Sequence, residues 1–270
     1  MPVSLEPVPD LTVSPAVHIA ATLAAGLVWL GVLIFASVQA RRHRSPIPLL
    51  FLLGGALTVG FEPIVDTLGK CYLPRNYQWT MFTVLDRPMP VYAVLVYSAF
   101  FGGFALMAWS HLRRGGAPSE LWRKYALAIA INTFLFETPA VPIFHVYTYY
   151  GNQPFDFWGF PLWWPFVNTA GPLVAGALVY VLQTHLELPA KRLLPLAVLL
   201  VPMGDGFSNA ASAYPTWLAL NSAVPAALTW GAGALTIGLA TLIVHGMIRG
   251  LTRIADPVQP RPQPAVSPRS

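Results

Sequence analysis

The chain has 270 residues, of which 55% are hydrophobic and only 10% are charged, so a soluble domain would lack the polar surface that it needs. The formal net charge is +5, but the Lys and Arg residues form short clusters between apolar runs, which does not indicate a nucleic-acid partner. The single cysteine, Cys71, excludes an internal disulfide, and no Cys or His pair has metal-ligand spacing, so neither a metal nor another cofactor is predicted. This composition indicates an integral membrane protein.

Apolar runs of about 20 residues, each long enough to cross a bilayer as a helix, follow one another along the chain. They lie near residues 16–39, 47–69, 89–111, 122–143, 163–184, 192–214 and 221–248. We therefore predict an all-α membrane protein, a seven-transmembrane helix bundle that occupies residues 1–254. Residues 255–270 are rich in proline and polar residues, and we expect them to form a disordered cytoplasmic tail.

Basic residues predict the orientation of this bundle. One predicted side holds Arg41, Arg42, Arg44, Arg113, Arg114, Arg123, Lys124, Lys191, Arg192, Arg249, Arg253, Arg261 and Arg269. The other side holds only Lys70, Arg75 and Arg87. Because cytoplasmic loops are enriched in Lys and Arg, the N-terminus is predicted to lie outside and the C-terminus in the cytoplasm, with a bacterial cytoplasmic membrane as the expected location.

Two predicted outer loops, roughly 70–88 and 144–162, are longer and more aromatic than the inner loops. Aromatic side chains commonly form a belt where a protein crosses the membrane surface. Here they are dense and alternate with Pro and Gly, which also favours a folded lid over the outer end of the bundle.

Three predicted spans run outward and carry an acid late in their length: Glu62, Glu137 and Asp205. At a rise of about 1.5 Å per residue, all three lie very roughly 20 Å from the inner surface, and so at a similar depth. Asp66 follows Glu62 by four residues, which places it on the same face of a regular helix. Ionisable groups are costly in hydrocarbon, so an acid at this depth usually lines a cavity and marks a functional site.

The residues next to these acids predict breaks in the helices. Pro63 follows Glu62, Pro139 and Pro142 follow Glu137, and glycines flank Asp205. Non-helical backbone at membrane depth is tolerated where it borders a cavity. The alternative is that the acids cap helix ends, pair with Arg75 or Arg87, or contact interfacial water, and for Asp66 the two interpretations stand open.

Carboxyl groups crowded into an apolar pocket repel one another, so at least one should keep its proton and serve as a general acid. Protonation of an alkene or epoxide gives a carbocation, which aromatic faces stabilise. The predicted catalytic residues are Glu62, Glu137, Asp205 and Asp66, and the predicted substrate-binding residues are Phe61, Phe136, Tyr147, Trp158, Trp164, Asn132, Asn168 and Asn209. The chain has no Asp-rich diphosphate motif, no lysine in the last span, no phosphate-binding loop and no nucleophile elbow.

The chain resembles the small integral-membrane terpene cyclases of fungal meroterpenoid pathways and bacterial drimentine-type indole-terpenoid pathways. The shared features are the seven predicted spans, an acid in the second span, further intramembrane acids and the lack of a metal motif. The resemblance implies a metal-independent, proton-initiated cyclisation of a linear prenyl chain on an acceptor, or of its epoxide. Glu62 matches the family's second-span acid. The family's other acid lies in the last span, where residues 221–248 have none, so the second role stays open between Asp205 and Glu137.

The leading hypothesis is a membrane-bound terpene cyclase in which one acid donates the proton and the others tune it or accept the final proton. Its partners would be a lipophilic prenylated molecule, such as a farnesylated indole, and membrane lipid. The same acids would suit a proton- or cation-coupled membrane transporter, because broken helices also build the midplane sites of carriers. A lipid-binding sensor or scaffold is a third, weaker interpretation.

Overall fold

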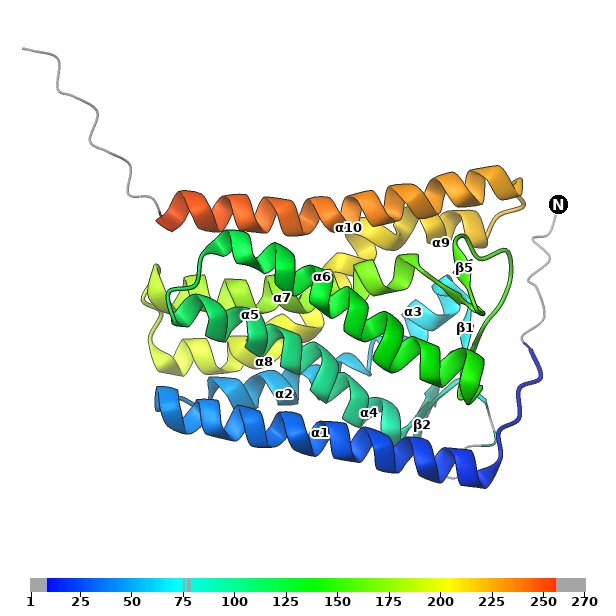
Figure 1. Cartoon of the computed structure of the whole chain (residues 1–270), viewed down its shortest axis with the longest axis horizontal. Helices are drawn as coiled ribbons and strands as arrows, with labels where there is room; N and C mark the ends of the chain where they lie inside the picture. Colours follow the sequence, from blue (N-terminus) through cyan, green and yellow to red (C-terminus); the bar gives the residue numbers. More distant parts are fainter. Residues whose placement is uncertain (1–8, 75, 77–78, 256–270) are drawn as a thin grey trace, which may run out of the picture.

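The computed structural model describes residues 9–74, 76 and 79–255 of the chain. Long helices run side by side along the longest axis of the molecule, with α1 and α10 at opposite edges of the bundle (Figure 1). The α-helices are α1 (Pro15–His43), α2 (Ile47–Thr58), α3 (Glu62–Gly69), α4 (Val91–Tyr97), α5 (Gly103–Arg113), α6 (Leu121–Ile131), α7 (Trp163–Thr184), α8 (Ala190–Ser208), α9 (Tyr214–Leu220) and α10 (Ala226–Ala255). A short 3-10 turn, η2 (Pro118–Glu120), precedes α6.

The protein is an all-α membrane bundle, as the sequence predicts. Among the described residues, 6 helices are long and apolar enough to cross a membrane, or up to 7 if the bent pair α2 and α3 forms one span. The sixth predicted run ends later than expected, because α9 continues to Leu220. The last helix begins at Ala226 rather than at 221, since Pro225 accepts the first helical hydrogen bonds and the Asn221 side chain donates to Trp217 O at 2.8 Å.

Several spans contain π-helical turns in place of regular α-helix. These turns are η1 (Ser98–Gly102), η3 (Asn132–Glu137), η4 (Pro139–Ile143) and η5 (Asn209–Ala213). In η4 the prolines at 139 and 142 lack the N–H that a regular helix needs. The predicted break at Glu137 is confirmed, and α2 and α3 meet at a bend of 50° just before Glu62. At Asp205 the expected break is displaced, because α8 stays regular to Ser208.

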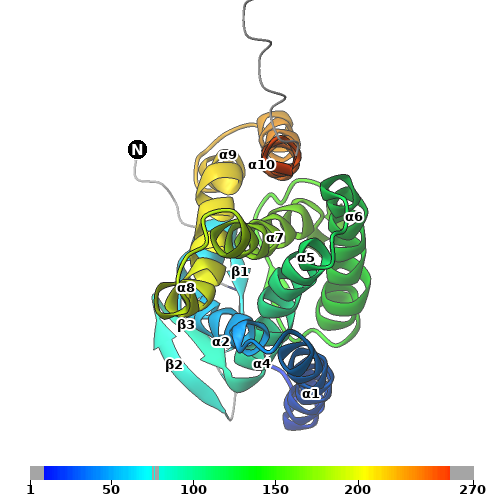
Figure 2. The same cartoon turned by 90° about the vertical axis from the view of Figure 1, so that its left-hand side faces the viewer.

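Glycines allow α2 to pack closely against η1, and α7 against α8. A Cβ atom on Gly171 of α7 would lie 2.6 Å from the carbonyl oxygen of Gly204 of α8, a distance that no side chain could occupy. A Cβ on Gly55 of α2 would lie 2.6 Å from the backbone nitrogen of Gly102 in η1. Small residues at such crossings let the helix backbones approach, which is how membrane helices gain packing energy. The end-on view shows α7 in the interior of the bundle and α1 at its edge (Figure 2).

The two loops predicted to form a lid fold into short antiparallel strand pairs at one end of the bundle (Figure 1). The strands are β1 (Cys71–Tyr72), β2 (Thr80–Val84), β3 (Arg87–Pro90), β4 (Thr148–Tyr149), β5 (Asp156–Phe157) and β6 (Phe160–Pro161). The β1–β4 pair joins the two loops, with Cys71 opposite Tyr149. At the other end of the chain, α10 continues to Ala255, and the rest of the predicted disordered tail lies outside the described residues.

Candidate functional site

A cavity of about 520 Å³ lies in the half of the bundle nearest the strands. Its walls come from α1, α3, α4, η1, η3, η4, the β1 and β4 strands and the beginning of α7. This volume falls within the range of about 300–1,000 Å³ that is usual for small-molecule sites. Most of the lining is apolar or aromatic, and the carboxyl groups in it belong to Glu62, Asp66 and Glu137.

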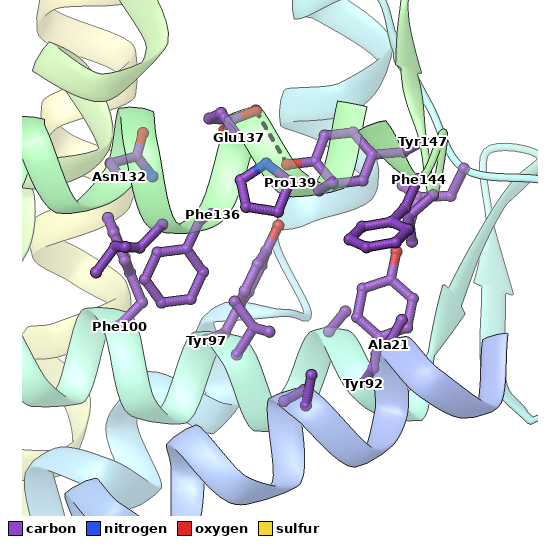
Figure 3. Close-up of a pocket in the computed structure, with 18 of the residues that line it drawn as sticks. Ala21, Tyr92, Tyr97, Phe100, Asn132, Phe136, Glu137, Pro139, Phe144 and Tyr147 are labelled. Atoms are coloured by element: carbon purple, nitrogen blue, oxygen red, sulfur yellow. Dashed lines mark hydrogen bonds between the residues drawn. The ribbon is translucent and has the colours of Figure 1, made fainter. Parts of the chain in front are cut away.

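Glu137 is held by phenol groups that arrive from the β4 segment. The Tyr147 hydroxyl donates a hydrogen bond to Oε2 at 3.0 Å, as Figure 3 shows. The Tyr149 hydroxyl donates to Oε1 and Oε2 at 3.3 and 3.2 Å. Alternate residues of an extended segment point to the same side, so the spacing of the two tyrosines brings both hydroxyls to one carboxyl group. The Glu137 side chain is only 4% exposed, and these donors compensate for its removal from water.

Both phenols lie beyond the end of the Pro118–Ile143 helix, and both side chains are partly buried. Burial raises the pKa of Tyr147 and of Tyr149 well above the ordinary tyrosine value, and the Glu137 charge raises it further. The two tyrosines therefore stay protonated at physiological pH and act as hydrogen-bond donors.

Glu62 and Asp66 form the second acidic group of the cavity. Glu62 is the first residue of α3, and Asp66 follows one turn later on the same face. The Tyr97 phenol and the Asp66 carboxyl both lie within interaction distance of the Glu62 carboxyl. Asp66 is 1% exposed, and its Oδ2 has no hydrogen-bond partner within the described part of the chain. Two adjacent carboxyl groups repel each other when both are ionised, and one of them here has an oxygen without a donor. Such a pair is suited to share a proton.

Arg87 lies in β3, near enough to Asp66 for its charge to act on that carboxyl group. It is 3% exposed, donates a hydrogen bond from Nη2 to Tyr150 Oη at 2.8 Å and stacks 5.3 Å from the Tyr72 ring centroid. The alternative interpretation expected an acid to pair with Arg87, and Asp66 is the acid on which the Arg87 charge acts. Arg87 itself does not line the cavity.

Asp205 is buried next to the cavity but does not line it. Its Oδ1 accepts a hydrogen bond from Asn209 Nδ2 at 3.0 Å, while Asp205 Oδ2 and Asn209 Oδ1 have no partner among the described residues. The prediction that Glu62, Glu137 and Asp205 line one cavity is thus wrong for Asp205. The third carboxyl group in the lining belongs to Asp66. The close contact of α7 and α8 at Gly171 explains this, because it leaves no open space beside Asp205.

The predicted substrate-binding residues divide in the same way. Those that line the cavity are Phe136, Tyr147, Trp164, Asn132 and Asn168. Phe61, Trp158 and Asn209 do not line it. Trp158 is 69% exposed at the turn between β5 and β6, where it stacks on Phe157. Phe61 packs beside Gly206 of α8, and Asn209 is bonded to Asp205.

Sequence reasoning missed several residues that build the cavity. Tyr97 contacts Glu62, and Phe100 forms a T-shaped ring pair with Phe136 at 5.4 Å. Tyr149 contacts Glu137; the sequence places it among the aromatic residues of the outer level, but it was not predicted as a binding residue. For Tyr149, the alternation with Tyr147 is a signal that could have been used. Alanines of α1 also line the wall, and their spacing of four residues is visible in the sequence.

No family model, curated protein or solved structure matches the chain. Within the described residues, no group of three or more His, Cys, Asp or Glu side chains is arranged to hold a metal ion. The fold and the site together define an α-helical membrane protein with a buried, aromatic cavity in which carboxyl groups converge.

Proposed function

We propose that the protein is a membrane-bound terpene cyclase that acts by protonation. It would cyclise a linear prenyl chain of the farnesyl type, carried by an acceptor such as an indole, without needing a metal. The observation that carries this proposal is the convergence of Glu62, Asp66 and Glu137 in one largely apolar, aromatic cavity. Such a cavity supplies a protonated acid, a base and a dry environment for a carbocation.

In the proposed reaction, the Glu62–Asp66 pair holds the proton that starts the chemistry. One carboxyl O–H gives its proton to the distal alkene carbon or to the epoxide oxygen, and the pair becomes a carboxylate. The resulting tertiary cation is attacked by the next alkene of the same chain, which closes a ring and moves the charge along. The cation in the final ring then loses a proton to a carboxylate, so an alkene substrate is isomerised with no net change in atoms or charge.

Glu137 suits the role of the final base. Phenol donors at 3.0 to 3.3 Å stabilise its charged form, because a carboxylate accepts hydrogen bonds better than a neutral acid does. In the Glu62–Asp66 pair the two carboxyl groups repel each other, and Asp66 Oδ2 has no hydrogen-bond partner among the described residues, which favours a retained proton. This division of roles between a poorly solvated acid and a well-bonded base is the usual way in which two carboxyl groups serve different steps.

The aromatic lining would guide the cation between these groups. Phe100 and Phe136 pair at 5.4 Å, and Tyr97 and Phe101 pair at 5.2 Å, and all four rings line the cavity. An aromatic face attracts a cation through its quadrupole but is a poor nucleophile. The rings would therefore stabilise the charge without ending the reaction early.

For the topology, we propose that α2 and α3 form one bent span, which gives seven spans with the N-terminus outside. The last turn of α1 holds Arg41 and Arg42, and the end of α5 holds Arg113, all at the end of the bundle opposite the strands. Basic residues favour the cytoplasmic side, so the cavity would lie near the outer surface. A bacterial cytoplasmic membrane remains the proposed location.

The direct test uses the purified protein in nanodiscs with farnesylated indole and farnesylated phenol acceptors and their terminal epoxides. We expect cyclised products, detected by mass spectrometry and NMR, from at least one member of this panel. Incorporation of deuterium at the distal carbon in D₂O would identify protonation as the first step for an alkene substrate. Recovery of every compound unchanged from folded wild-type protein would refute the proposal.

A proton- or cation-coupled transporter is the second candidate, and one observation favours it. Asp205 and Asn209 form a buried polar pair outside the cavity lining, and each has an oxygen without a partner among the described residues. A carrier could bind a cation or relay a proton at such a place. Uptake into liposomes that depends on a proton or sodium gradient, and that is lost in Asp205→Asn, would support the transporter and contradict the cyclase.

A further inference from the structure

One ridge of α1 lines the cavity and is exposed on the outside of the bundle at the same time. Ala16, Ala20, Ala24 and Val28 follow one another at a spacing of four, which places them in a row along one side of the helix. All four are exposed, and Val28 is 46% exposed. The next row inward, which includes Ala21 and Ala25, is more buried, so the exposed row forms the rim of the cavity rather than its floor.

The opposite rim belongs to the η3 and η4 turns. Leu135 and Phe144 both line the cavity, and they are 68% and 54% exposed. In Figure 3, Ala21 of α1 and Phe144 lie on facing sides of the cavity, with the Tyr92 ring near them. In the described part of the chain, α1 packs mainly against α2 and α4 and makes no extensive contact with α6, η3 or η4. The cavity therefore opens sideways between these two walls.

This opening lies along membrane-spanning helices and is lined by apolar side chains. Both α1 and the Pro118–Ile143 helix have the length and hydropathy of membrane spans, so the gap between their flanks faces hydrocarbon. Glu62 and Asp66 lie on α3, which forms neither side of the gap, so the cavity runs from an apolar mouth to these two acids, while Glu137 lies on η3, the element that also carries Leu135. The alanines keep the mouth wide, since a larger side chain in this row would fill it.

We propose that the substrate enters from the bilayer through the gap between α1 and η3–η4, with the distal end of its prenyl chain first. This inference rests on the proposed cyclase function. The distal alkene would reach Glu62 and Asp66, and the acceptor would remain in the gap in contact with lipid. A membrane-dissolved prenyl ether or prenyl indole is the chemical class that fits, because its chain is apolar along its whole length.

This orientation separates two kinds of specificity. The chain lies in a closed, aromatic part of the cavity, so its length and branching should matter strongly. The acceptor lies in the opening, where few side chains surround it, so indole, phenol and other aromatic acceptors should be turned over at similar rates.

Photolabelling tests this proposal without relying on turnover. One probe is a farnesyl phenyl ether with a diazirine on the phenyl ring, and the second carries the diazirine at the distal end of the chain. In nanodiscs, the ring probe should label the Ala20–Val28 row, Leu135 or Phe144, and the distal probe should label Tyr97 or Phe136. Labelling of the β1 and β4 region by the ring probe would instead show access from water and would overturn the proposal.

Variants that fill the gap sharpen this experiment. Ala24→Trp should lower labelling by the distal probe about tenfold, and Leu135→Trp should do the same from the other wall. Leu27→Trp is the matched control, because Leu27 is 72% exposed on α1 but does not line the cavity. Unchanged labelling in both gap variants, with thermal stability equal to wild type, would refute the lateral opening.

The two proposals can fail separately. If the probes label as expected but no cyclised product forms from wild type, the lateral opening stands and the cyclase does not. If products form but the gap variants neither slow turnover nor change labelling, the cyclase stands and the lateral opening does not.

Discussion

The two halves of the bundle differ in packing, since one has a dense core and the other contains the cavity. Around α2, α5, α7 and α8 the helices are regular, and large side chains such as Trp109 and Leu173 are fully buried in a dense apolar core. Around α3, η3 and η4 the helices are broken, and a cavity remains in which Asp66 Oδ2 and Asn132 Oδ1 have no hydrogen-bond partner within the described ranges. Glycine contacts between helices close the first half, although α7 and α8 also contain internal prolines, whereas the successive π turns η3 and η4 border open space in the second. We call them the closed half and the open half.

The largest expected effect comes from removing the proposed acid in the open half. Glu62→Gln keeps the size and shape of the side chain but cannot donate the initiating proton. We expect the rate of product formation to fall by about 10²- to 10⁴-fold, the usual contribution of a general acid. Turnover would be measured by mass spectrometry, and thermal unfolding in detergent should change little.

Glu120→Gln provides the matched control for this change. Glu120 has a side chain that is 53% exposed next to His111, far from the cavity lining. The control should retain wild-type turnover. A Glu62→Gln variant that is as active as the control would remove Glu62 from the mechanism.

The next largest effect is expected on stability, when a close helix contact in the closed half is over-packed. Gly171→Val would place a side chain against Gly204, so α7 and α8 must move apart. Over-packing of this kind costs about 1–3 kcal/mol or more, and we expect a clear loss of thermal stability together with a loss of folded protein. Gly231→Val in α10 is the control, because a Cβ there meets no atom within 4 Å. Equal melting temperatures for the two variants would contradict the close helix crossing.

The hydrogen bonds to Glu137 should have an intermediate effect on activity. Tyr147→Phe removes the donor at 3.0 Å from Oε2 and leaves the ring in place. A hydrogen bond to a charged group contributes about 1.5–3 kcal/mol, so turnover should fall by about tenfold or more. If Glu137 removes the last proton, the ratio of alkene products should also change.

Tyr214→Phe is the control for the tyrosine experiment, since Tyr214 is 61% exposed and lies outside the cavity lining. It should show neither effect. A Tyr147→Phe variant with an unchanged rate and unchanged products would exclude this hydrogen bond from the reaction.

The comparison of the two halves also shows what the sequence could predict. Apolar runs and buried acids depend on local patterns, so the helical membrane bundle, the break at Glu137 and the position of Glu62 at a bend between helices could be predicted from the sequence. The partner of Glu62 depends on how helices rotate against one another. Asp66 lines the cavity and Asp205 does not, since Asp205 lies at the close crossing of α7 and α8, where a Cβ on Gly171 would be 2.8 Å from Asp205 Cα. The local sequence around either acid does not show which of the two lines the cavity with Glu62.

Tyr149 and the α1 alanines illustrate a second limit. Tyr149 donates to Glu137 from β4, a strand that pairs with β1, which lies far away in the sequence. The alanines look like an ordinary lipid-facing stripe, and they gain a role only because η3 and η4 leave the opposite wall unfilled. Long-range pairing and the absence of a neighbouring side chain are both properties of the assembled bundle.

The smallest expected effect concerns Asp205, which lies between the two halves. Asp205→Asn preserves the shape of the side chain and its capacity to accept a hydrogen bond from Asn209. Because Asp205 does not line the cavity, cyclisation should stay within about threefold of wild type, comparable to the modest effect of a neutral hydrogen-bond change. A transporter that uses this acid would instead lose gradient-driven uptake. Measuring turnover and liposome uptake on the same Asp205→Asn preparation therefore decides whether the open half alone carries the function, because the two mechanisms assign opposite importance to this buried acid outside the cavity lining.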